Sequence, residues 1–229
     1  MNQETEPIID VVIPVHNRSQ YLDEAICSVL SQSGFQTHVF VIDDYSDFPV
    51  TLNADLLASE QLTLVRSTTH LGIGGARNLG ARQGSADWLA FLDSDDVWRP
   101  DHCAALMNLM DDFLDFTSGA TVHFADPSQG SEYFVPDDVQ LGSCAGSTLF
   151  RRAAFYKIGG FRDQFKVGEF IDLMARGSAV GWKSRRTTDV VLERRVPDSH
   201  ASRGASADDL GYLRVIRDHI NRTRDSPRA

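Results

Sequence analysis

The sequence predicts an α/β fold in which a mixed, mostly parallel sheet is flanked by helices, within a single domain spanning residues 1–229. First, short apolar runs of strand length alternate with segments of helical periodicity. Second, several of these runs end in polar or acidic residues, which is typical of the ligand-binding edge of an open parallel sheet. Third, 229 residues with 42% hydrophobic and 24% charged content suit one soluble domain with its own core.

The first three strands and the first helix follow from the apolar pattern. Residues 8–13 form an almost continuous apolar run, consistent with a strand buried on both faces, and Pro14 is expected to end it. Ser19 is then the expected N-cap of a helix with one apolar face. That face consists of Leu22, Ala25, Ile26, Val29 and Leu30. Residues 39–42 and 62–65 are the next two strands, and this alternation predicts βαβ units whose strand ends meet at one crevice.

The rest of the chain predicts further elements. An apolar run that begins at Trp88 leads into an acidic stretch, and Pro100 stands where a helix could begin. The apolar face of that helix consists of Cys103, Leu106, Met107 and Met110. We then expect a strand at 116–124, a loop at 126–138, a short helix at 152–158, an edge strand at 190–196 and a terminal helix at about 207–221. The small residues of 142–150 either leave room for a substrate or form a plain loop.

Asp93, Asp95 and Asp96 place three carboxylates within four residues at the end of a buried strand. Carboxylates this close repel one another unless a cation or hydrogen bonds offset the repulsion. The pattern therefore predicts a site for Mg²⁺ or Mn²⁺, whose open coordination positions can take phosphate oxygens. The alternative is an Asp-rich turn that caps the following helix.

Four blocks of the chain, in their order and spacing, resemble the family 2 glycosyltransferases, which read roughly VIPxYNR, DDxS, GxxxARNxG and FLDxDD. The corresponding segments are 11–18, 43–46, 72–80 and 91–96. The likeness is strong over about residues 8–112 and weaker to about 195. It implies a Rossmann-like GT-A fold with a nucleotide-binding half at about 8–112 and an acceptor half at about 113–206. The glycines of 72–80 do not follow the first strand with GxGxxG spacing, so a dinucleotide loop is rejected.

The resemblance implies an inverting transferase that uses a nucleotide diphosphate sugar, most often UDP-linked, with Mn²⁺ or Mg²⁺. Its nucleotide-binding residues would be Pro14, His16, Asn17, Asp44, Arg77, Asp93 and Ser94. The Asp44 carboxylate suits the N3–H of uracil, although Asp44 could also belong to a simple turn. Asp95 would bind the metal ion, and His200 is either a further metal ligand or a solvated loop residue. Asp96 and Trp98 would contact the donor sugar.

The catalytic base is expected at the start of a helix near residue 169. The family usually shows GEDxDL there, whereas this chain has Phe170 in place of the second acid. Helical spacing directs Phe170 inward and leaves Glu169 nearest to the cleft, so Glu169 is the first choice of base and Asp172 the second. Alternatively, Glu169 only complements the positive end of the helix dipole.

The net charge, the cysteine content and the length of the apolar stretches limit the kinds of binding partner and location that we expect. A net charge of -10, from 32 acidic and 22 basic residues, disfavours nucleic acid as a partner. Three cysteines without a CxxC pair indicate neither a disulfide framework nor a zinc site, and they fit a cytoplasmic protein. No apolar stretch reaches the ~20 residues of a membrane helix. The acceptor stays open among saccharide, peptide and lipid-linked molecules, and so does homo-oligomer formation.

Two other functions are weighed against the transferase. A nucleotide-sugar binder without catalytic activity is compatible with Phe170. A nucleotidylyltransferase would share the crevice and the metal carboxylate, but it should carry a Gly-rich, basic loop after the first strand. Residues 14–18 do not form such a loop.

Overall fold

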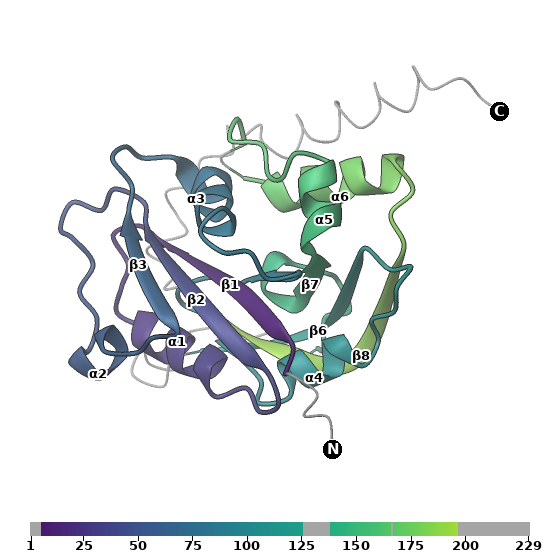
Figure 1. Ribbon diagram of the computed structural model, residues 1–229, viewed down its shortest axis with the longest axis horizontal. Helices are drawn as coiled ribbons and strands as arrows, with labels where there is room; N and C mark the ends of the chain where they lie inside the picture. Colours follow the sequence, from purple (N-terminus) through teal and green to yellow (C-terminus); the bar gives the residue numbers. More distant parts are fainter. Residues whose placement is uncertain (1–5, 126–137, 166, 197–229) are drawn as a thin grey trace.

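The computed structural model describes residues 6–125, 138–165 and 167–196 and contains one mixed sheet flanked by helices, as the sequence predicts (Figure 1). Its strands are β1 (Ile8–Val15), β2 (Gln36–Asp43), β3 (Leu62–Arg66), β4 (Trp88–Phe91), β5 (Val97–Trp98), β6 (Phe116–Phe124), β7 (Thr148–Arg151) and β8 (Ser184–Arg195). Their order across the sheet is β3-β2-β1-β4-β7-β6-β8-β5. The strands β1 to β4 run parallel, β7 is antiparallel to β4 and β6, and β8 is parallel to β6. One sheet therefore passes through both predicted halves of the chain.

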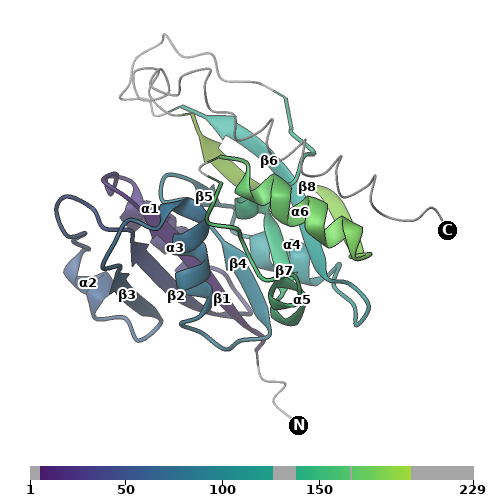
Figure 2. The same ribbon diagram turned by 90° about the horizontal axis from the view of Figure 1, so that it is seen from above.

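Helices cover both faces of the sheet, and each face has its own apolar core (Figures 1 and 2). They are α1 (Leu22–Leu30), α2 (Ala54–Leu57), α3 (Gly72–Ala81), α4 (His102–Met107), α5 (Arg152–Lys157) and α6 (Glu169–Ala179), with a 3-10 turn at Ala145–Ser147. Val29 of α1 and Leu106 of α4 belong to one core. Ala76 of α3, Phe155 of α5 and Leu173 of α6 belong to the other. Burying a side chain of Leu or Phe size stabilises the fold by ~1.5 to 3 kcal/mol, so these two layers hold the strand ends in place.

The first strand continues to Val15, so the prediction that Pro14 ends it is wrong. The N–H of Leu92 donates to the carbonyl of Val12, which shows that the backbone polar groups of Val12 face β4. The backbone of Pro14, two residues further on, faces the same side, but at a position beyond the last residue of β4. Its missing N–H therefore removes no ladder hydrogen bond.

Two other local expectations differ from the structure. Helix α1 begins at Leu22, with Tyr21 as its N-cap, so Ser19 is not the cap. Strand β8 is not at the edge, because the two-residue β5 pairs along its outer side. The pairing of β5 with β8 joins segments distant in sequence, which local patterns do not report.

Some predicted elements lie outside the described residues. These are the terminal helix at about 207–221, His200 and all but the last residue of the loop at 126–138. Within the part of the chain that the structure describes, every helix is too short or too polar to cross a bilayer.

Candidate functional site

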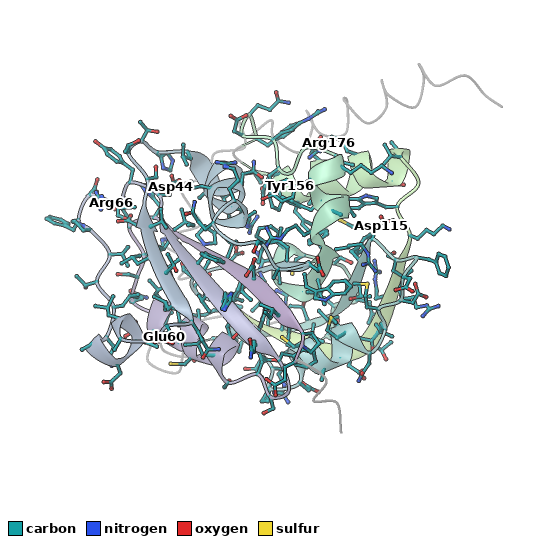
Figure 3. All side chains as sticks on the ribbon, in the orientation of Figure 1. Asp44, Glu60, Arg66, Asp115, Tyr156 and Arg176 are labelled. Carbon is teal, nitrogen blue, oxygen red and sulfur yellow. The ribbon has the colours of Figure 1, made fainter. Side chains whose placement is uncertain are left out.

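A cleft of about 900 Å³ opens at the carboxyl ends of β1, β2 and β4, beside the start of α3 and the end of β8. Seven predicted site residues line it: Pro14, His16, Asp44, Asp93, Ser94, Asp95 and Asp96. Figure 3 labels Asp44 at the end of β2, next to α3. Parallel strands bring their carboxyl ends to one edge of the sheet, so residues distant in sequence share this wall.

Asp44 and two histidines form one side of the cleft. The buried Asp44 carboxylate accepts a hydrogen bond from the N–H of Leu71 at 2.7 Å, and its second oxygen lies 3.0 Å from Nδ1 of His70. His16 Nδ1 lies 2.8 Å from the Asp44 carbonyl oxygen, and the His16 and His70 ring centroids are 4.3 Å apart. This arrangement offers hydrogen-bond acceptors and flat ring surfaces to a planar ligand.

The turn after β2 is held by a network beside the cleft. The Asp43 carboxylate accepts hydrogen bonds from the backbone of Ser46 and Val50 and from Arg66, the last at 2.6 Å. Burial acts to raise the pKa of Asp43, but these hydrogen bonds outweigh it and lower the pKa below its usual value. Asn17 does not line the cleft, because its N–H donates to the Ser46 hydroxyl and its side chain accepts a backbone N–H of the same turn. Asn17 therefore ties the end of β1 to this turn.

Two carboxylates of the acidic turn have raised pKa values. Burial raises the pKa of Asp95, and the charge of Asp93 raises it further. Burial and the charges of both neighbours raise the pKa of Asp96 well above its usual value. Arg194 Nε lies 3.9 Å from the Asp96 carboxylate, and Arg195 donates its N–H to that carboxylate and its Nε to the Asp95 carbonyl. These contacts hold the turn, while its carboxylates still raise one another's pKa.

The donor atoms of this turn fit a hard divalent cation. Mg²⁺ and Mn²⁺ prefer carboxylate oxygens and are often held by only one or two of them. Asp95 and Asp96 both line the cleft, but Asp96 already accepts a backbone N–H, so Asp95 is the better placed ligand. Among the described residues, no group of three His, Cys, Asp or Glu side chains is arranged to hold a metal. A cation would therefore take its other ligands from water, from phosphate oxygens or from the rest of the chain.

Arg77 is buried and is not part of the cleft lining. Its two terminal nitrogens lie 2.6 Å from Glu169 Oε1 and 2.5 Å from Asp93 Oδ1. Burial acts to lower the pKa of Arg77, but the two carboxylates outweigh it and raise the pKa. This position differs from the predicted contact with base and ribose, because Arg77 instead joins the acidic turn to the first residue of α6.

Helix α6 carries both predicted base candidates, and their partners distinguish them. Gly168 is the N-cap with a left-handed φ of 86°, a conformation that glycine adopts without strain. Glu169 follows it, with its side chain 11% exposed and bonded to Arg77. Asp172 is fully buried, and its carboxylate lies 2.7 Å from Arg176 Nε, one turn along the same helix. Of the two acids, Glu169 has the bridge to the cleft wall through Arg77.

Trp98, which was predicted to contact the donor sugar, and Phe170, which was predicted to point inward, both pack in or against the core. Trp98 is 2% exposed, stacks on His102 at 3.6 Å between ring centroids, and donates its indole N–H to the carbonyl of Gly146. We therefore do not place Trp98 in the donor site. Phe170 packs against the core that contains Leu173, as helical spacing predicts.

Five basic residues that the sequence analysis did not assign to the site also line the cleft. They are Arg18, His70, His123, Arg194 and Arg195. Arg18 lies in the first motif block, where a ligand role could have been inferred. His123 of β6 and Arg194 of β8 are register partners, and Arg194 together with burial lowers the pKa of His123. Only the long-range pairing of these two strands brings them together, so no local signal could have found them.

The chain is similar to proteins of one enzyme family. The model of the family described as glycosyl transferase family 2 matches residues 10–159. The succinoglycan biosynthesis protein ExoW of Rhizobium meliloti (strain 1021) is 42% identical over 100 residues, which cover 41% of this chain and 31% of ExoW. The Escherichia coli UDP-Glc:alpha-D-GlcNAc-diphosphoundecaprenol beta-1,3-glucosyltransferase WfgD is 29% identical over 91 residues, covering 40% of this chain and 36% of WfgD. The chain thus spans about a third of the length of these relatives.

Solved structures share the fold over nearly the whole chain. Staphylococcus aureus TarS 1-349 in complex with UDP-GlcNAc has a TM-score of 0.72 at 17% identity, covering 96% of this chain and 68% of TarS 1-349. The mannosyltransferase PcManGT of Pyrobaculum calidifontis, in complex with GDP-Man and Mn²⁺, has a TM-score of 0.68 at 18% identity, covering 96% of this chain and 65% of that one. At these identities the likeness concerns the fold, and it confirms the predicted GT-A fold.

Proposed function

The chain belongs to glycosyl transferase family 2, and from that premise we propose that it transfers a sugar, with inversion, from a nucleotide diphosphate sugar to an acceptor nucleophile. The observation that carries the proposal is the single cleft whose wall holds both Asp44 and the acidic turn from Asp93 to Asp96. A nucleotide diphosphate needs both features, because its base requires hydrogen-bonding groups and its phosphates require a cation. The names of the similar proteins favour UDP as the nucleotide and leave GDP as the second choice.

Each wall of the cleft receives a part of the donor in this scheme. Pro14, His16 and Asp44 hold the base, and Asp93 and Ser94 hold the ribose. Asp96 contacts the sugar. Asp95 holds Mn²⁺ or Mg²⁺, which when bound supplies positive charge for the leaving diphosphate. The lining of the cleft by all seven residues supports this assignment.

The proposed reaction is a single displacement. The acceptor oxygen forms a bond to the anomeric carbon while the bond from that carbon to the diphosphate oxygen breaks. The electron pair leaves with the nucleoside diphosphate, and Glu169 takes the proton of the acceptor hydroxyl. Because attack occurs opposite to the leaving group, the anomeric configuration inverts. Glu169 connects to the cleft wall through Arg77, so the acceptor enters from the α6 side.

A second candidate function is nucleotide-sugar binding without transfer. Two observations favour it, namely Phe170 in place of the family's second acid and the burial of Glu169. This alternative predicts metal-dependent UDP binding without release of UDP from any donor. Release of UDP distinguishes the two functions.

A thermal-shift screen of UDP-sugars and GDP-sugars, with and without Mn²⁺, tests donor binding. A ligand at about 100 times its dissociation constant adds ~2.7 kcal/mol of stability, so the correct donor should raise the melting temperature clearly. Asp95→Asn should fold normally and lose the part of the shift that depends on Mn²⁺. A nucleotide-diphosphate release assay on the selected donor then tests transfer. Equal shifts with and without Mn²⁺, in both wild type and Asp95→Asn, would contradict the metal assignment.

A further inference from the structure

Helix α3 presents different residues to the cleft and to the segment that leads into α6. The residues on its cleft side are Gly72, Ile73 and Ala76. Gly74, Arg77 and Asn78 are spaced i, i+3 and i+4, so they share another face of the helix. All three contact the segment from Phe161 to Glu169. One short helix thus touches both the donor side and the base side of the proposed site.

The contact between α3 and this segment is close and specific. A Cβ on Gly74 would lie 3.3 Å from the carbonyl oxygen of Arg162 and 3.3 Å from Cβ of Phe161, so a side chain there would have to displace backbone. Asn78 Nδ2 donates to the Phe161 carbonyl at 2.8 Å, and the Phe161 N–H donates back to Asn78 Oδ1 at 3.0 Å. These contacts set the distance between α3 and the start of α6.

Arg77 lies at this junction between two carboxylates of different exposure. The Glu169 side chain is 11% exposed, and the Asp93 side chain, in the cleft wall, is 29% exposed. Among the described residues the buried Nε of Arg77 has no hydrogen-bond partner, so the two terminal nitrogens make the contacts with the carboxylates. One cation between two carboxylates leaves a net negative charge, and burying it is costly unless the geometry is good.

We propose that Arg77 is a positioning residue that fixes the Glu169 carboxylate relative to Asp93, and thereby sets the base against the donor. This inference rests on the proposed function and adds to it a mechanical link between the two substrate sides. The planar guanidinium holds two carboxylates in a rigid fork, which a lysine ammonium on a flexible stem does not reproduce. Misplacing a reacting group by ~1 Å can cost ~100-fold in rate.

The test compares Arg77→Lys with wild type and with a matched control. Arg77→Lys should lower kcat by ~100-fold while the KM for the donor changes less than about threefold, because the lysine keeps a positive charge beside Asp93 but loses the rigid fork that fixes Glu169. The control is Arg176→Lys, the same substitution at the other buried arginine that pairs with an acid of α6. Its kcat should stay within about threefold of wild type, since Arg176 is not among the residues that line the cleft.

A double variant separates positioning from general damage to the fold. If Arg77 acts through Glu169, Arg77→Lys combined with Glu169→Gln should turn over no more slowly than Glu169→Gln alone. Should Arg77→Lys fail to fold, Arg77→Gln with Glu169→Gln removes both charges and allows the same comparison. Equal turnover supports the inference, and a further loss of about tenfold or more overturns it.

The outcomes also distinguish this inference from the proposed function. An active wild type whose kcat is unchanged by Arg77→Lys overturns the inference alone. A wild type that releases no nucleoside diphosphate from any donor overturns the proposed function and the inference with it.

Discussion

Two buried arginines, Arg77 and Arg176, pair with the two acids of α6, and their other partners differ. Arg77 bridges Glu169 of α6 and Asp93 of the cleft wall. Arg176, labelled in Figure 3, pairs with Asp172 and donates its terminal nitrogens to two backbone carbonyls after α5, each at 2.6 Å. The Arg77 pairs therefore join two parts of the proposed site, whereas the contacts of Arg176 stabilise the turn that follows α5. The location of the second partner, rather than burial or charge, separates the two roles.

The largest effect on turnover is expected for Glu169, the acid that Arg77 joins to the cleft wall. Glu169→Gln should lower turnover by ~100 to 10,000-fold, because it removes the proposed general base while keeping its shape. Steady-state release of nucleoside diphosphate, with acceptor or water, measures this change. If a folded Glu169→Gln variant turns over as fast as wild type, Glu169 is not the base, and the Arg77 and Arg176 pairs no longer differ in their relation to catalysis.

Asp172, the acid that pairs with Arg176, should affect stability instead of turnover. Asp172→Asn breaks the buried ion pair with Arg176 and removes the charge of a carboxylate that also lies 3.5 Å from Arg162, so the unfolding free energy should fall by ~3 to 5 kcal/mol. Urea unfolding measures the loss, and turnover per folded molecule should stay near wild type. Loss of turnover without loss of stability would instead make Asp172 the base.

A smaller, pH-dependent effect on the unfolding free energy is expected from His102, whose partner is also a backbone carbonyl. Its ring is buried, and Nδ1 lies 2.9 Å from the carbonyl oxygen of Val191. Burial lowers the pKa of His102 to about 3, and the hydrogen bond to Val191 opposes this only in part. An unfolded histidine titrates near ~6.5, so between about pH 6.5 and 3 the unfolded chain holds more protons and stability falls as pH falls.

This contribution should approach ~1.4 kcal/mol per pH unit in the middle of that window. His102→Phe keeps a ring against Trp98 and cannot titrate, so its unfolding free energy should fall less steeply with decreasing pH than that of wild type. Urea unfolding at several pH values between about 4 and 7 compares the two slopes. Parallel slopes would show that His102 is not held neutral in the folded protein.

Local patterns predicted the elements well where the contacts are near in sequence. The strand at Phe116–Phe124 matches the expected 116–124, and the buried face of α1 contains Leu22 and Val29 as its helical spacing requires. The start of α6 at Glu169 was also expected, from the resemblance of this segment to the family's GEDxDL motif. Such features depend on side-chain periodicity and backbone preference, which neighbouring residues express.

The partners of site residues were harder to predict. Arg77 contacts Asp93 and Glu169, which lie 16 and 92 positions away. Trp98 was predicted to contact the donor sugar through the apolar face of its ring. The register of β5 against β8 instead places it in the core. A side chain's partner is set by where whole elements pack, and packing sums many weak contacts that no short pattern contains.

The sequence by itself determined the α/β architecture, the family and the acids at the strand ends, since each depends on residue type and on spacing along one segment. Only the tertiary structure decided that Arg77 joins Asp93 to Glu169, and that β6 and β8 bring His123 and Arg194 to the cleft. The reason is physical: charge and periodicity are local properties, whereas the pairing of buried charges depends on which distant segments exclude water together.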